Sequence, residues 1–167
     1  MDPTPERPTP GSSRQLLRHT LATLAYRGGK VMRGAPPNFT EYRASDTTRA
    51  SGQILAHLAD LLDWALTQAN GKQDWHDSKP LPWDEGTKRF FVSLKALDDY
   101  LASDAQLSCP PEKLFQGAIA DSLTHIGQLA MLRRLAGAPI RAENYAQAEI
   151  VAGRVGAQQT QPRREFD

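Results

Sequence analysis

Two residues with the chemistry of metal ligands or acid–base groups stand one helical turn apart near the middle of a long run. Asp121 and His125 lie four residues apart within the run from Ala118 to Leu135, so an α-helix places them on one face. Apolar residues of the run and its two ends project the same way: Leu114, Ala118, Leu129, Leu132 and Ala136. The spacing therefore predicts a carboxylate and an imidazole pointing into the core. They need a partner there, because unpaired burial is costly.

A second histidine, His57, belongs to another apolar helical pattern. It follows Ile54 by three residues and precedes Leu61 by four, which places it at the edge of a buried stripe. Two imidazoles and a carboxylate suit Zn²⁺, Ni²⁺ or Fe²⁺ and leave coordination positions for water or substrate. The spacing equally allows a metal-free network in which Asp121 accepts a hydrogen bond from His125 or from a neighbouring hydroxyl.

Gln128 and the pair Arg133-Arg134 follow on the same predicted helix. Gln128 is one turn beyond His125, so its amide can support that imidazole or contact a bound ligand; a plain surface glutamine is the alternative. The two arginines stand near the helix C-terminus, where cations complement the helix dipole. Either guanidinium could instead reach an anionic substrate.

The remaining two histidines and two further aspartates show less sign of a functional role. His19 is expected to be a partly exposed helix residue, and His76 has no partner at a recognisable spacing. Asp60 and Asp63 fall on the polar side of the helix that carries His57 and are expected to be solvated.

Hydrophobic periodicity predicts an all-α protein. Four amphipathic helices are expected at about 12–33, 49–70, 84–103 and 108–136, with a short extra C-terminal helix at 142–152. Such segments form a four-helix bundle. The domain prediction is a disordered N-terminal segment at 1–11, the bundle at 12–156 and a flexible C-terminal tail at 157–167.

Composition narrows the function classes. The 167 residues carry a net charge of +1, so the composition gives no sign of the basic face that nucleic-acid binding requires. No apolar run approaches the roughly 20 residues of a membrane span. The single cysteine, Cys109, excludes an internal disulfide framework and fits a reducing compartment. The N-terminus has no apolar core typical of a signal peptide. We therefore expect a soluble cytoplasmic protein that binds neither nucleic acid nor membrane.

Two motifs, in this order along the chain, resemble motifs of the DinB-like (YfiT-type) superfamily of metalloenzymes. Ile54-Leu-Ala-His57-Leu-Ala-Asp-Leu-Leu-Asp-Trp64 resembles the histidine-bearing second helix of that family. Asp121-Ser-Leu-Thr-His125-Ile-Gly-Gln128-Leu is similar to its His-x-x-x-His followed by Gly-Gln. The resemblance spans about 16–156.

The resemblance implies an up-down-down-up four-helix bundle, commonly a homodimer, with a divalent metal held by three histidines. Relatives include hydrolases and transferases that use a low-molecular-weight thiol on small-molecule substrates. His57 and His125 match two ligand positions, and Asp121 stands where the family usually has its third histidine. The leading hypothesis is a metal-dependent transferase or hydrolase with ligands His57, Asp121 and His125.

Two other functions fit the same residues. The first is a metal-free bundle that binds a small ligand or partner without catalysis. The second is a structural dimer whose polar core residues set the helix register.

Overall fold

The computed structural model describes residues 10–166, which are helical apart from loops and one isolated β-bridge. Four long helical runs dominate this part of the chain. They are α1 (Pro10–Met32), α2 (Ser51–Ala69), α3 (Trp83–Ala102) and a fourth run made of α4 (Pro111–Leu114), a π-helical turn η2 (Phe115–Ile119) and α5 (Ala120–Leu135). The predicted all-α class is confirmed, and the bounds fall close to those expected from periodicity.

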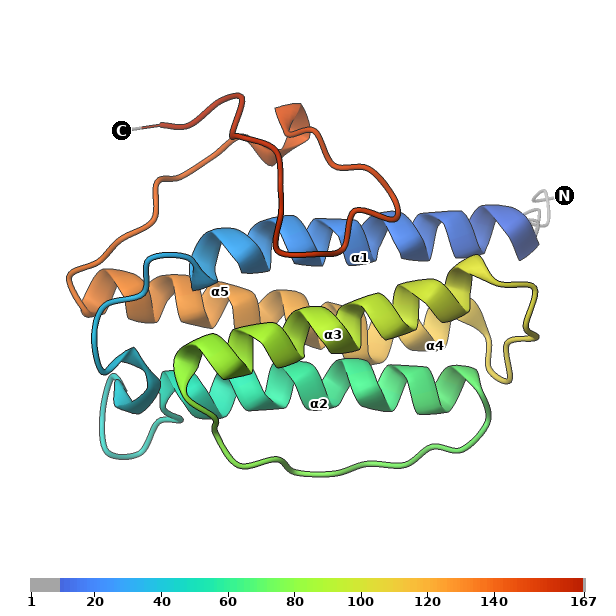
Figure 1. Ribbon diagram of the computed structural model, residues 1–167, viewed down its shortest axis with the longest axis horizontal. Helices are drawn as coiled ribbons and strands as arrows, with labels where there is room; N and C mark the ends of the chain where they lie inside the picture. The colour runs from blue at the N-terminus through green and yellow to red at the C-terminus, as the bar shows by residue number, and fades with distance from the viewer. Residues whose placement is uncertain (1–9, 167) are drawn as a thin grey trace, which may run out of the picture.

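The long runs lie side by side along the long axis of the molecule (Figure 1). α2 packs on α3 and α5, and α1 packs on the same two helices, an arrangement compatible with a helical bundle. Each helix buries one apolar stripe in a shared core, with Leu21, Leu58, Leu94 and Leu129 fully buried. Helices α1 and α3 approach closely at Gly28, where an added Cβ would meet Phe90 Cζ at 3.1 Å.

The connection between α2 and α3 is long and irregular. After Ala69 the chain turns at Gly71, whose φ of +86° suits glycine, and then follows the outside of α2 back to the start of α3 (Figure 1). Residues 72–82 form no helix. Side-chain bonds fix this connection to α2, and they are described with the site below.

A shorter connection joins α1 to α2 and includes the 3-10 turn η1 (Phe39–Glu41). Phe39 is buried and stands edge-on to Trp83 with ring centroids 4.8 Å apart. Ser51 N–H at the start of α2 donates to Tyr42 O at 2.8 Å. These contacts hold the segment between η1 and α2 in place.

The predicted C-terminal helix at 142–152 is wrong apart from one 3-10 turn, η3 (Tyr145–Gln147). The backbone on either side of η3 is extended because its polar groups bond elsewhere. Asn144 N–H donates to Arg164 O at 3.0 Å, and Phe166 N–H donates to Ala142 O at 2.8 Å. The segment therefore pairs with the end of the chain instead of closing helical hydrogen bonds.

The structure covers only part of the predicted N- and C-terminal segments. Of the expected disordered segment 1–11, residues 1–9 lie outside the described residues, and Pro10 and Gly11 form the first turn of α1. The described part of the tail 157–167 contributes the pairing just given, and its flexibility stays a prediction. Among residues 10–166, no helix has the length and apolar character that crossing a membrane requires.

Candidate metal centre

Helix α2 holds His57 at the border between core and solvent. Its neighbours Ile54, Leu58 and Leu61 are buried, and the His57 side chain is 18% exposed. Burial lowers the pKa of His57 below its ordinary value, and the nearby His125 and Arg49 lower it further, against the opposing effect of Asp121. His57 is therefore biased toward the neutral imidazole, the form that binds metals.

Helix α5 carries Asp121 and His125, but it presents them differently from the prediction. His125 is buried, whereas the Asp121 side chain is 47% exposed. The π-helical turn η2 just before α5 explains the difference, because a π-turn accommodates about one extra residue and displaces the downstream face. Ser122 and Ile126 occupy the middle of the buried face, and Asp121 moves to its edge.

The three side chains nevertheless converge. Asp121 Oδ1 lies 3.4 Å from His125 Nε2, and Asp121 Oδ2 lies 3.6 Å from His57 Nε2. The two imidazole rings meet edge to face with centroids 4.8 Å apart, and one ligand atom from each residue lies within 4.8 Å of the others. The two oxygen–nitrogen distances are long for hydrogen bonds. The distance to His125 is at the upper limit of the roughly 3.0–3.4 Å between ligand atoms that share a metal at about 2.1 Å, and the distance to His57 is slightly longer.

Gln128 fixes which nitrogen of His125 faces Asp121. His125 Nδ1–H donates to Gln128 Oε1 at 2.7 Å, so in the neutral ring the proton is on Nδ1 and Nε2 carries a free lone pair. A lone pair facing a carboxylate is unfavourable unless a proton or a cation stands between them. Metal-ligating histidines are commonly held by this kind of hydrogen bond on the far nitrogen.

Two tryptophans form a wall beside His57. Trp75, from the long connection, stands edge-on to His57 with ring centroids 5.6 Å apart, and Trp64 of α2 stands edge-on to Trp75 at 5.8 Å. The loop therefore covers one side of the imidazole. The sequence pattern did not predict this contact, because the loop has no periodicity that reveals its path.

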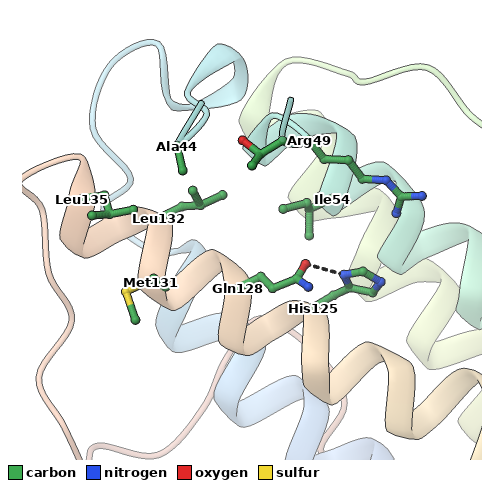
Figure 2. A pocket seen from close by; sticks show the side chains of 9 residues that line it. Ala44, Arg49, Ile54, His125, Gln128, Met131, Leu132 and Leu135 are labelled. Carbon is green, nitrogen blue, oxygen red and sulfur yellow. Dashed lines mark hydrogen bonds between the residues drawn. The ribbon is translucent and has the colours of Figure 1, made fainter. Parts of the chain in front are cut away.

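A cavity of about 470 Å³ reaches the centre at His125, which lines it together with Gln128. Figure 2 shows His125 and the Arg49 guanidinium toward one end and Met131 and Leu135 toward the other. The lining is apolar over most of its extent and consists of Ala44, Thr48, Arg49, Ile54, His125, Gln128, Met131, Leu132 and Leu135. Its size falls in the range typical of small-molecule sites.

A second cluster of possible ligands, Asp60, Asp63 and His76, lies farther along α2. Here a protein cation already stands between the carboxylates, since Arg89 Nη2 lies 2.5 Å from Asp60 Oδ1 and 2.8 Å from Asp63 Oδ2. His76 Nε2 is 3.0 Å from the same Asp60 oxygen. A metal would have to compete with the guanidinium, so we interpret this cluster as an ion-pair network.

The expectations for these residues therefore need correction. Asp60 is 2% exposed rather than solvated, and its other oxygen accepts from Ser78 N–H at 2.8 Å. His76, which the sequence left without a partner, joins the network. The partners come from α3 and from the long connection, so spacing along α2 could not reveal them.

Arg133 has a role that the helix-dipole interpretation missed. Its buried guanidinium donates to Val31 O at 2.6 Å, Arg33 O at 2.8 Å and Gly34 O at 2.9 Å, and its Nε–H donates to Ala138 O at 2.8 Å. It thus satisfies carbonyls at the C-terminal end of α1. Arg134 is exposed, as is His19.

The comparisons with known proteins identify no relative: no family model, no curated protein and no solved structure matches the chain.

Proposed function

We propose that the protein is a metal-dependent enzyme in which His57, Asp121 and His125 hold a divalent cation beside a small-molecule cavity. The observation that carries this proposal is the pairing of His125 with Gln128, which turns the free Nε2 lone pair toward the Asp121 carboxylate and the His57 imidazole. Zn²⁺, Ni²⁺ and Fe²⁺ suit this donor set.

The resemblance to the DinB-like superfamily forms part of the same proposal. The long connection that follows the outside of α2, so that α2 and α3 begin at the same end (Figure 1), supports the up-down-down-up order of that family. Asp121 in place of the usual third histidine would give a two-histidine, one-carboxylate site. Such a site has a harder donor set than three imidazoles.

Each residue has a distinct task in the proposed reaction. His57 and His125 supply neutral nitrogen ligands from two helices, Asp121 supplies the charge, and Gln128 holds the His125 tautomer. Trp75 limits solvent access to His57. A bound divalent cation would lower the pKa of a water or a thiol toward neutrality, which is the chemistry of a hydrolase or a thiol-dependent transferase.

A thiol nucleophile would have to be a separate small molecule. Cys109 is the only cysteine of the chain, it packs against the core, and burial raises its pKa above the ordinary value. A raised pKa keeps it as the unreactive thiol at neutral pH. Among the described residues it also belongs to neither cluster of possible metal ligands.

Calorimetric titration of metal-free protein with Zn²⁺ and Ni²⁺ tests the metal centre. We expect about one ion per chain and a higher melting temperature with metal, since an ion that binds only the folded state adds about 2.7 kcal/mol at a hundredfold excess over its Kd. His57→Ala and Asp121→Ala should abolish both effects, and His19→Ala, at an exposed position of α1, is the matched control. Absence of binding to the unaltered protein would overturn the proposal.

The variant Asp121→His examines the family resemblance separately. It restores the three-histidine set, so tighter Zn²⁺ binding than in the unaltered protein is expected. Light scattering would test the associated homodimer, which has twice the 18.4 kDa chain mass.

A metal-free ligand-binding protein is the second candidate function. The cavity favours it, because most of its lining is apolar and requires no ion to form. Under this alternative, small molecules bind equally well before and after chelation, and metal leaves the melting temperature unchanged.

A further inference from the structure

The cavity next to the candidate metal centre has a charge pattern that suggests what it binds. Arg49 is the only Lys, Arg, Asp or Glu among the nine residues that line it. Arg49 is exposed, and no carboxylate of the described residues forms a salt bridge with it. By contrast, the guanidinium of Arg18 pairs with Asp98, and that of Arg89 pairs with Asp60.

The segment that carries Arg49 is fixed before any ligand arrives. Thr48 Oγ1 accepts from Ser45 N–H at 3.1 Å and donates to Ser45 O at 2.9 Å, which closes a local turn. On the other side, Ser51 N–H donates to Tyr42 O at 2.8 Å at the start of α2. Little backbone ordering is therefore needed on binding, and such preorganisation favours affinity.

The opposite end of the cavity is apolar and unusually exposed. Met131 and Leu135 on α5 each keep 55% of their surface accessible, and Ile54 and Leu132 continue the apolar lining toward His125. Figure 2 shows the Arg49 guanidinium and the His125 ring at the other end. The cavity thus pairs an apolar floor with a cationic end.

We infer that this cavity takes a small amphipathic carboxylate, with its charged group on Arg49 and its apolar body over Ile54, Met131, Leu132 and Leu135. As a substrate site the inference rests on the proposed function; as a binding site it does not. His125 belongs to both the cavity and the candidate metal centre, so the bond next to the carboxylate would lie beside the metal. One aspartate among the ligands leaves a divalent ion and Arg49 with excess positive charge, which also favours an anion.

Calorimetry with 4-phenylbutyrate and 4-phenylbutan-1-ol tests the inference, because the two probes share an apolar body and differ in charge. With metal-free protein we expect the carboxylate to bind about tenfold more tightly, the lower end of what a hydrogen bond to a charged group contributes. Arg49→Gln should reduce the carboxylate to the level of the alcohol. Arg134→Gln, an exposed arginine of α5 outside the lining, should change neither probe.

Leu135→Ser should weaken both probes alike and so report on the apolar end. Each titration is repeated with Zn²⁺ present, after circular dichroism has shown that the variants retain their helix content. Arg49-dependent binding of 4-phenylbutyrate supports the inference even if no metal binds, an outcome that would remove the proposed function alone. Two results overturn the inference: no binding with or without Zn²⁺, and binding of 4-phenylbutyrate that Arg49→Gln leaves unchanged, whether or not it needs Zn²⁺.

Discussion

At the scale of single residues, the hydrogen bond between His125 and Gln128 matters most. The carbonyl oxygen of Gln128 accepts from His125 Nδ1 at 2.7 Å and leaves Nε2 to face Asp121. A neutral histidine without this bond can carry its proton on either nitrogen. The tautomer with a free lone pair on Nε2 is then no longer the favoured one. Gln128 therefore acts through His125 and is a positioning residue for the proposed metal centre.

Gln128→Leu tests this role. We expect metal affinity to fall by about 10–100-fold, the usual effect of removing a hydrogen-bond partner of a ligating histidine. Gln128→Glu keeps an acceptor at the same place and should bind metal at least as tightly as the unaltered protein. Calorimetric Kd values for Zn²⁺ measure both changes. An unchanged Kd in Gln128→Leu would show that the tautomer is set by something else.

At the scale of elements, periodicity was enough to locate the helices and the three converging residues. Apolar spacing predicted all four long runs, and the placement of His57 at the edge of one stripe follows from Ile54 and Leu61. The exposure of Asp121 could not be predicted in this way. It depends on the π-helical turn at Phe115–Ile119, which continues the helix but rotates the buried face of the residues that follow. A prediction that assumes 3.6 residues per turn throughout does not include this rotation.

The path of the long connection between α2 and α3 could not be predicted from the sequence either. It has no periodic pattern. Its position depends on individual contacts with Asp60, which accepts a hydrogen bond from Ser78 N–H and pairs with His76 and Arg89. Those partners are 18, 16 and 29 residues away in sequence. Trp75 reaches His57 because its neighbour His76 is held by this network.

Asp60→Asn should loosen the connection and destabilise the fold. Removing the charge leaves the partly buried Arg89 with Asp63 as its only carboxylate partner. Because Asp63 remains, we expect the free energy of unfolding at pH 7 to fall by about 2–3 kcal/mol, at or below the lower limit for a broken buried ion pair. Urea denaturation measures the change. Asp99→Asn, in an exposed pair with Lys95, is the control and should leave stability unchanged.

The same variant has a predictable pH dependence. Burial alone would raise the Asp60 pKa, but hydrogen bonds from Ser78 and Arg89 outweigh it and hold the pKa below its ordinary value. The stabilisation is fully present above the unfolded carboxyl pKa of about 4 and is lost as pH falls through the lower folded value. The difference between Asp60→Asn and the unaltered protein should therefore shrink below pH 4. A constant difference across that range would contradict the assignment.

At the scale of the whole molecule, the segment after α5 is tied to α1 by a buried polar network. Glu143 accepts from Tyr26 Oη at 2.6 Å and from Lys30 Nζ at 2.7 Å, and Lys30 also pairs with Glu165 at 2.7 Å. Lys30 and the acidic residues are more than a hundred positions apart in the chain. The apolar pattern of residues 142–152 gave no indication of this network, which explains why a helix was predicted there.

Glu143→Gln tests how far this segment supports the fold. The Glu143 side chain is fully buried, so losing its charge beside Lys30 should lower the free energy of unfolding by about 3 kcal/mol. Glu149→Gln removes an exposed carboxylate that pairs with Arg163 and should have no measurable effect. Thermal melting followed by circular dichroism distinguishes the two. Equal melting temperatures for both variants would show that the segment contributes little to stability.

The contact between Trp75 and His57 also allows metal binding to be followed by the intrinsic tryptophan fluorescence of the protein. The chain has three tryptophans, and only Trp75 places its ring against a candidate ligand, 5.6 Å from the His57 ring between centroids. Paramagnetic Ni²⁺ quenches indole emission at close range, whereas Zn²⁺, with its filled d shell, does not. The occupancy of the candidate site can therefore be followed by ultraviolet fluorescence in the unlabelled chain, with Trp75→Phe as the blank.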